Sequence, residues 1–236
     1  MKIRGRRECA DCGRAWSYYE TGAVRCPDCG SLRSLGVDDE RSLHTASPAT
    51  LDLAPVRAAI DDEPLRRLAE RASERCQEFN RGYGFVDAGA LQPLDDTYLA
   101  AMELRAVAGE LARRMDVVNE EEWYFTRLLR ADAGDRPAVE EVPSSVAAFR
   151  GLAYADAVDA YRSDLRTYLE DRPDPSVGRI LERLDVHVRR IQALDGDVPP
   201  RHAEALVEAA RDVGRHVVEG DEADLADAHA RLDGLE

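Results

Sequence analysis

Four cysteines near the N-terminus are the residues whose type and spacing point most clearly to a chemistry. Cys9 and Cys12 form one Cys-x-x-Cys-Gly motif, Cys26 and Cys29 form a second, and 13 residues lie between Cys12 and Cys26. Four thiolates at this spacing can close a tetrahedron around one metal ion, with metal–sulfur distances of about 2.3 Å. Two disulfides are the alternative, but a reducing compartment disfavours them and the first residues do not form an export signal. We therefore expect these four cysteines to bind a metal.

The donor set predicts a structural metal site. Four protein ligands fill the shell of a tetrahedral ion, so no position stays open for water or substrate. Zinc is the expected ion, one per chain, although a single iron of the rubredoxin kind takes the same ligands. A helical peroxidase that carries such an iron also needs paired Glu-x-x-His motifs for a di-iron centre. The residues three positions before the four C-terminal histidines are Leu184, Pro199, Val213 and Ala226, so these motifs are absent and zinc is favoured.

Short β structure must position the two cysteine motifs. Gly13 and Gly30 follow the second cysteine of each motif, where a positive φ turns backbone N–H groups toward the sulfurs at no steric cost. Residues 16–24 predict a β-hairpin with a Glu-Thr-Gly turn. A zinc ribbon of residues 1–37 is too small to bury a sufficient core, so metal binding would supply its folding free energy.

The segments Cys9 to Gly13 and Cys26 to Gly30 resemble the zinc ribbon of transcription factor IIB-type proteins. The whole chain, with its acidic helical C-terminal part, is similar to an uncharacterised haloarchaeal family of zinc-ribbon-containing proteins. The resemblance implies zinc at the four cysteines and a link to transcription or macromolecular assembly. The chain departs from the transcription factor because it lacks that factor's paired cyclin-like repeats and basic DNA-facing surface. A general role in initiation is therefore not implied.

The composition describes an acidic, folded protein. The 236 residues carry 32 Lys and Arg against 47 Asp and Glu, a net charge of -15, and 44% of them are apolar. The bias to Arg and Ala fits a GC-rich genome, whereas the carboxylate excess keeps proteins hydrated at molar salt and predicts a halophilic origin. No apolar run reaches the roughly 18 residues of a membrane span. We expect a cytoplasmic protein without a membrane partner.

The charge divides the chain into two units. Residues 1–37 hold seven cations and four anions, a net of +3, and the rest of the chain has a net of -18. The polar segment 38–50 has the composition of a linker. We expect a zinc ribbon over 1–37, a linker over 38–50 and an acidic helical bundle over 51–236.

Apolar residues recur at helical spacing throughout the third segment, which predicts a mainly α protein with a small β ribbon. Cys76 falls on such a stripe and is expected to be a buried small hydrophobe. A heptad-like seam predicts one long helix from about Leu94 to Ala131. The other expected helices cover residues 55–60, 62–82, 144–168, 174–194, 202–218 and 222–232.

Catalytic residues are not evident. The chain contains no P-loop, dinucleotide fingerprint or nucleophile elbow, and its histidines are expected to be solvated or capping groups. Glu122 falls on the predicted apolar seam, which indicates a buried carboxylate facing a site between helices. An Arg partner, or a seam that ends before this residue, is the simpler interpretation.

Three functions remain open. The first is a non-catalytic zinc-ribbon protein that acts as a protein-interaction module. The second is nucleic-acid binding through the basic ribbon, and the third is an enzyme with its site in the bundle near Glu122. The first is favoured because molar salt weakens phosphate binding and the acidic body repels polyanions. The candidate partner-binding residues of the ribbon are Arg6, Arg7, Arg14, Trp16, Tyr18 and Tyr19. The sequence leaves the oligomeric state open.

Overall fold

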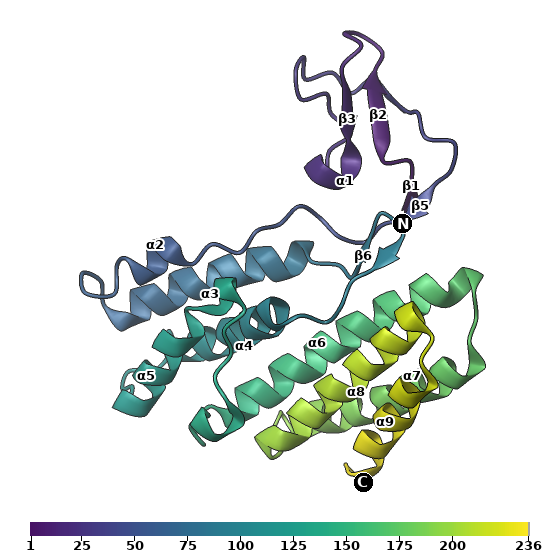
Figure 1. Ribbon diagram of the computed structural model, residues 1–236. Helices are drawn as coiled ribbons and strands as arrows, with labels where there is room; N and C mark the ends of the chain where they lie inside the picture. The colour runs from purple at the N-terminus through teal and green to yellow at the C-terminus, as the bar shows by residue number, and fades with distance from the viewer. Residues whose placement is uncertain (236) are drawn as a thin grey trace. The chain divides into compact units, whose positions relative to one another are not determined.

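The computed structural model describes residues 1–235, and 57% of the chain is helical. The expected fold class, mainly α with a small β region near the N-terminus, is confirmed (Figure 1). The chain forms two compact units, the first made of Met1–Ala49 with Gly82–Gln92 and the second of Thr50–Arg81 with the residues from Pro93 onward. Of the segment 38–50, which we expected to be a linker, residues 38–49 lie in the first unit and Thr50 lies in the second.

The first unit contains a three-stranded antiparallel sheet. Strand β2 (Arg6–Cys9) lies between β3 (Ala15–Ser17) and β4 (Ser34–Gly36), with Arg7 opposite Trp16 and Cys9 opposite Ser34. This arrangement places the first cysteine of the chain at the end of the central strand.

The prediction of a β-hairpin over residues 16–24 is wrong. After β3 the chain forms one helical turn, α1 (Tyr18–Thr21), instead of returning as a strand. The Ser17 side chain caps this turn by accepting a hydrogen bond from the Glu20 N–H, and Gly22 closes it at φ +62°. The glycine thus ends a helical turn in place of reversing a hairpin.

Two further strand pairs complete the first unit. Strand β1 (Lys2–Ile3) pairs with β5 (Ser42–Leu43), and β6 (Val86–Asp87) pairs with β7 (Ala90–Leu91). The backbone of Thr45 donates a hydrogen bond of 2.9 Å to the carbonyl of Val86. These pairings fix the backbone of residues 42–45, which follow the three-stranded sheet in the chain.

The second unit is a bundle of helices. Its α-helices are α2 (Ala54–Arg57), α3 (Leu65–Gly82), α4 (Asp96–Leu111), α5 (Asn119–Leu128), α6 (Ala147–Tyr168), α7 (Pro175–Ala193), α8 (Pro200–Glu219) and α9 (Glu222–Asp233). Short 3-10 helices lie at η1 (Ala131–Ala133), η2 (Val139–Glu141) and η3 (Leu169–Asp171). None of the helices within residues 1–235 has the length and apolarity that a membrane crossing requires.

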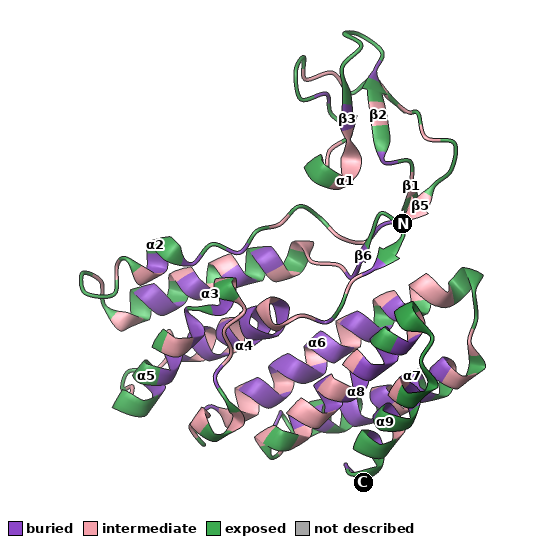
Figure 2. Ribbon diagram, viewed as in Figure 1, coloured by how far each residue is buried: buried purple, intermediate pink, exposed green. Residues whose placement is uncertain are grey.

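Helix α6 is central to the core of the bundle. It packs against α4, α7 and α8, and Figure 2 shows buried positions along much of α4 and α6. At Gly214 of α8 an added Cβ would collide with the hydroxyl of Tyr161 on α6, so glycine allows the close approach of these two helices. Cys76 of α3 is fully buried, as its place on an apolar stripe predicts.

The prediction of one long helix from about Leu94 to Ala131 is wrong. Helix α4 ends at Leu111 and α5 begins at Asn119, and two residues of the predicted seam, Met115 and Val118, are 99% and 58% exposed. Val118 is extended and precedes α5, and the Glu121 carboxylate accepts a hydrogen bond from its backbone N–H at 3.2 Å. This cap starts a new helix while the apolar spacing continues unchanged through the break.

Candidate metal centre

The four cysteines of the two motifs converge in the first unit. Their sulfur atoms all lie within 4.8 Å of one another, and the Cys9–Cys29 and Cys12–Cys26 sulfurs are each 3.6 Å apart. A tetrahedral ion with metal–sulfur bonds of about 2.3 Å requires sulfurs about 3.8 Å apart, whereas a disulfide requires about 2 Å. All four are free thiols, so their arrangement fits a metal ion and the group could hold one.

The two motifs have the same backbone geometry. Gly13 and Gly30 have φ values of +73° and +71°, the positive φ that the sequence predicts. Each glycine donates its backbone N–H to the carbonyl of the first cysteine of its motif, Cys9 or Cys26, at 3.0 Å. Each motif is therefore a tight turn that brings its two sulfurs to the same side.

The thiols affect one another's ionisation. The backbone N–H groups of Cys29 and Asp28 hold the pKa of Cys26 at about 7, against the cost of burial. The N–H of Arg14 favours the Cys12 thiolate, but the neighbouring thiols and burial raise the pKa of Cys12 to about 12. Four negative charges this close repel one another strongly, so full ionisation of the group requires a bound cation.

Polar contacts hold the two motifs to each other. The Asp11 carboxylate accepts hydrogen bonds from the Ser31 hydroxyl at 2.5 Å and from the Arg33 guanidinium at 2.8 Å. Arg14 lies 3.7 Å from Asp28 in the other motif. Beneath the sulfurs, Trp16 packs in one buried cluster with Cys9 and Cys26.

The six candidate partner-binding residues have different surroundings. Trp16 is buried and donates from its indole N–H to the carbonyl of Ala23 at 3.0 Å. The rings of Tyr18 and Tyr19 pack against the buried His44, with centroids 5.9 and 4.8 Å away. None of these three aromatic rings therefore forms an open platform for a base.

The cationic candidates are only partly free. Arg7 is hydrogen-bonded to the Ser34 hydroxyl and carbonyl, whereas Arg6 and Arg14 are exposed. The complete first unit has eight Lys and Arg side chains against eight Asp and Glu side chains, because residues 38–49 and 82–92 add acidic groups. The excess of positive charge in residues 1–37 is thus balanced within the unit.

Glu122 is exposed on α5, so the interpretation of this residue as a buried carboxylate is wrong. Its neighbour Glu121 is buried instead, where it caps α5 and pairs with Arg114 at 2.5 Å. The seam ends before Glu122, which was the simpler interpretation.

The bundle contains a buried polar cluster that the sequence pattern did not predict. Glu103 of α4 is completely buried and accepts hydrogen bonds from the hydroxyls of Tyr124 and, at 2.9 Å, Tyr154. Arg150 of α6 lies 3.8 Å from the Glu103 carboxylate and donates a hydrogen bond to the Pro137 carbonyl at 3.1 Å. Burial raises the pKa of Glu103, while Arg150 and the two hydroxyls oppose this effect. The signal available in the sequence was a lone charged residue between the apolar positions Tyr98 and Leu104.

One comparison with known proteins gives a match. The model of a family described as a family of unknown function, DUF7117, matches residues 1–232. No curated protein and no solved structure matches the chain.

Proposed function

The chain belongs to the family of unknown function DUF7117, so we propose its function from the chemistry of its own site. Cys9, Cys12, Cys26 and Cys29 hold one structural Zn²⁺, and the metal-bound ribbon (residues 1–37) acts as a non-catalytic protein-interaction module. The observation that carries this proposal is the convergence of four free thiols at separations that fit a tetrahedral ion. The resemblance of the ribbon to that of transcription factor IIB-type proteins supports a role in transcription or macromolecular assembly in the cytoplasm.

Zinc is supported by the chemistry of the donors. Four thiolates satisfy a tetrahedral ion that has no redox chemistry, and a closed shell leaves the metal a folding role. A four-thiolate iron has the same ligands, but the sequence provides no Glu-x-x-His pairs for an iron centre in the bundle that would exchange electrons with it. The four cysteines would hold the ion, and the glycine turns and the Asp11 contacts would keep them in place.

A protein partner is supported by the surface of the ribbon. Leu32 and Leu35 follow the second motif and are 65% and 67% exposed. Exposed leucines gain free energy when a partner buries them, and salt does not screen this gain. The buried Trp16 and the two tyrosines that pack against His44 lack the open ring faces that base stacking requires.

Affinity capture with the full-length protein tests this proposal. We expect the captured partner to resist nuclease, to be lost on zinc chelation, and to be lost when Leu32 and Leu35 are replaced by serine. The matched control is Val186→Ser, which removes an exposed apolar side chain of α7 and should leave capture unchanged. The proposal would be contradicted if nuclease abolished the capture and the protein also shifted DNA or RNA in a gel at the same salt concentration.

A further inference from the structure

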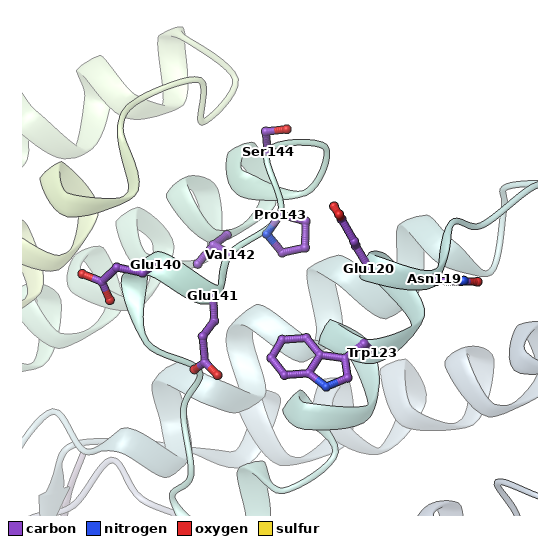
Figure 3. Close-up of a pocket in the computed structure, with 8 residues that line it drawn as sticks. All are labelled: Asn119, Glu120, Trp123, Glu140, Glu141, Val142, Pro143 and Ser144. Atoms are coloured by element: carbon purple, nitrogen blue, oxygen red, sulfur yellow. The ribbon is translucent and has the colours of Figure 1, made fainter.

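The bundle carries a second surface with distinct chemistry, at the start of α5. A hollow of about 510 Å³ lies between α5 and η2, and Trp123, Glu120, Glu140, Glu141 and Pro143 are among its lining residues. Figure 3 shows the Trp123 indole and the Glu141 side chain extending into the same space from these two elements, whereas Glu140 points outward. The hollow is within the size range of ligand-binding pockets.

The carboxylates of this hollow are available to a ligand. Glu120 and Glu140 have no hydrogen bond or ion pair with any residue from 1 to 235, and both are exposed. Glu141 accepts a hydrogen bond from the Ala138 N–H at 2.6 Å, and Arg127 lies 3.9 Å from it. Glu120 is therefore an uncompensated negative charge on the same helix as the indole, whereas the Glu140 carboxylate is directed away from the ring.

The Trp123 ring already forms a cation–π contact within the chain. Trp123 is 49% exposed, and the guanidinium carbon of Arg127 lies 5.8 Å from its ring centroid. Tryptophan is the most effective side chain for such cation–π contacts. An incoming Arg or Lys side chain would find the exposed part of the ring together with the carboxylates.

Apolar residues extend this surface beyond the hollow. Val118, which is 58% exposed, forms with Asn119 and Glu120 a second, open depression beside the first. A small polyamine would use the carboxylates and the ring but would leave Val118 in water. A protein segment that combines cationic and apolar side chains would cover both.

We propose that the hollow between α5 and η2 is a docking site for a cationic, partly apolar segment of a partner protein. The segment places an Arg or Lys side chain between Trp123 and the Glu120 carboxylate, and an apolar side chain against Val118. This site is separate from the metal centre and does not depend on the proposed role of the ribbon.

Fluorescence anisotropy of a labelled synthetic peptide in which Arg and Leu alternate tests the site. Full-length protein at moderate salt should bind it, and an Arg/Ser peptide of equal charge should bind several-fold more weakly. Trp123→Ala and Glu120→Gln should each weaken binding by about tenfold, since anchor residues dominate interfaces. The matched control, Glu182→Gln with Glu219→Gln, removes two exposed carboxylates elsewhere on the bundle and should change affinity less than about twofold.

Several results would overturn the proposal. The first is equal binding of the Arg/Leu and Arg/Ser peptides, because it would show attraction to net charge alone. The second is an equal loss with the control pair, or no binding at all. The third is a change of oligomeric state on Trp123→Ala, seen by analytical ultracentrifugation, which would assign the hollow to a second copy of the chain. Zinc chelation should leave peptide affinity unchanged, and a loss on chelation would count against the bundle as the binding unit.

Discussion

At the scale of single residues, the five cysteines of the chain have contrasting surroundings. Four lie together at tetrahedral spacing, whereas Cys76 is buried within α3, where burial raises the pKa of its thiol to about 12. Among residues 1–235, Cys76 belongs to no group of three or more side chains that could share a metal ion. The same residue type therefore has two roles, which its neighbours determine.

Replacing one cysteine at a time should separate these roles. We expect Cys29→Ser to lose the metal and to unfold the ribbon, because three ligands and a hydroxyl hold the ion much less tightly. Cys76→Ala should keep full metal content, since it removes only a small buried side chain. Elemental analysis and amide exchange of the ribbon would report both, and a metal loss in Cys76→Ala would contradict the assignment.

Replacing single residues of the buried cluster around Glu103 should lower the free energy of unfolding. Arg150→Met removes a cation that pairs with both the Glu103 and the Glu204 carboxylates, and loss of one partner of a buried pair typically costs about 3–5 kcal/mol of unfolding free energy. The milder change Tyr154→Phe removes one hydrogen bond to Glu103 and should cost about 1–2 kcal/mol. Urea unfolding measures both.

The control for this cluster lies on the same helix. Arg166→Met replaces an exposed arginine of α6 and should change the unfolding free energy by less than about 0.5 kcal/mol. The double variant Glu103→Gln with Arg150→Met should lose less than the sum of the single losses, because no charge is then left at position 103 without its partner and Glu204 keeps Arg136 at 3.3 Å. Additive losses would mean that the two groups do not interact.

At the scale of elements, one carboxylate joins helices distant in the sequence. Asp132 in η1 accepts hydrogen bonds from the Leu53 N–H at 2.9 Å and from Arg57 of α2 at 2.6 Å. Burial alone would raise the pKa of Asp132, but these two donors outweigh it and hold the pKa below its ordinary value. A depressed pKa in the folded state links this contact to pH.

The contact should therefore weaken in acid. Its stabilisation is fully present above the ordinary carboxyl pKa of about 4 and is lost as pH falls through the lower pKa of the folded state. We expect Asp132→Asn to cost about 1–3 kcal/mol near neutral pH, and the difference from the wild type to shrink on acidification. The control is Asp135→Asn, whose partner Arg130 is largely exposed, and a constant difference at every pH would be the contrary result.

The sequence predicts some elements better than others, for physical reasons. The cysteine cluster depends on spacing within two short turns, which the chain encodes locally at Gly13 and Gly30. The break between α4 and α5 depends on the capping of Val118 by Glu121, which a continuing apolar period conceals. The partners of Glu103 come from positions 21 and 51 residues away, so no local pattern reveals them.

At the scale of the whole molecule, the acidity is concentrated in one unit. The bundle unit has 24 Lys and Arg against 39 Asp and Glu side chains, whereas the first unit is balanced. Like charges on a compact body oppose folding, and salt screens them over a length of about 3 Å at molar concentration. Many arginines pair with the acids, but the excess remains.

Salt should therefore stabilise the bundle. We expect the helical signal to melt at higher temperature as KCl is raised from millimolar to molar concentration. Circular dichroism follows this transition. The control is the melting temperature in sucrose, because sucrose stabilises the folded state without screening charge. A melting temperature that does not respond to KCl would contradict a role of the carboxylates in adaptation to salt.

Native mass spectrometry with elemental analysis of the full-length protein identifies the metal held by Cys9, Cys12, Cys26 and Cys29. The protein should be purified without added metal and without chelators. We expect one zinc per chain, released when the thiols are modified, with no other metal at comparable content. Iron at this stoichiometry with the red colour of a ferric–thiolate centre, or disulfides among the four clustered cysteines, would contradict this expectation.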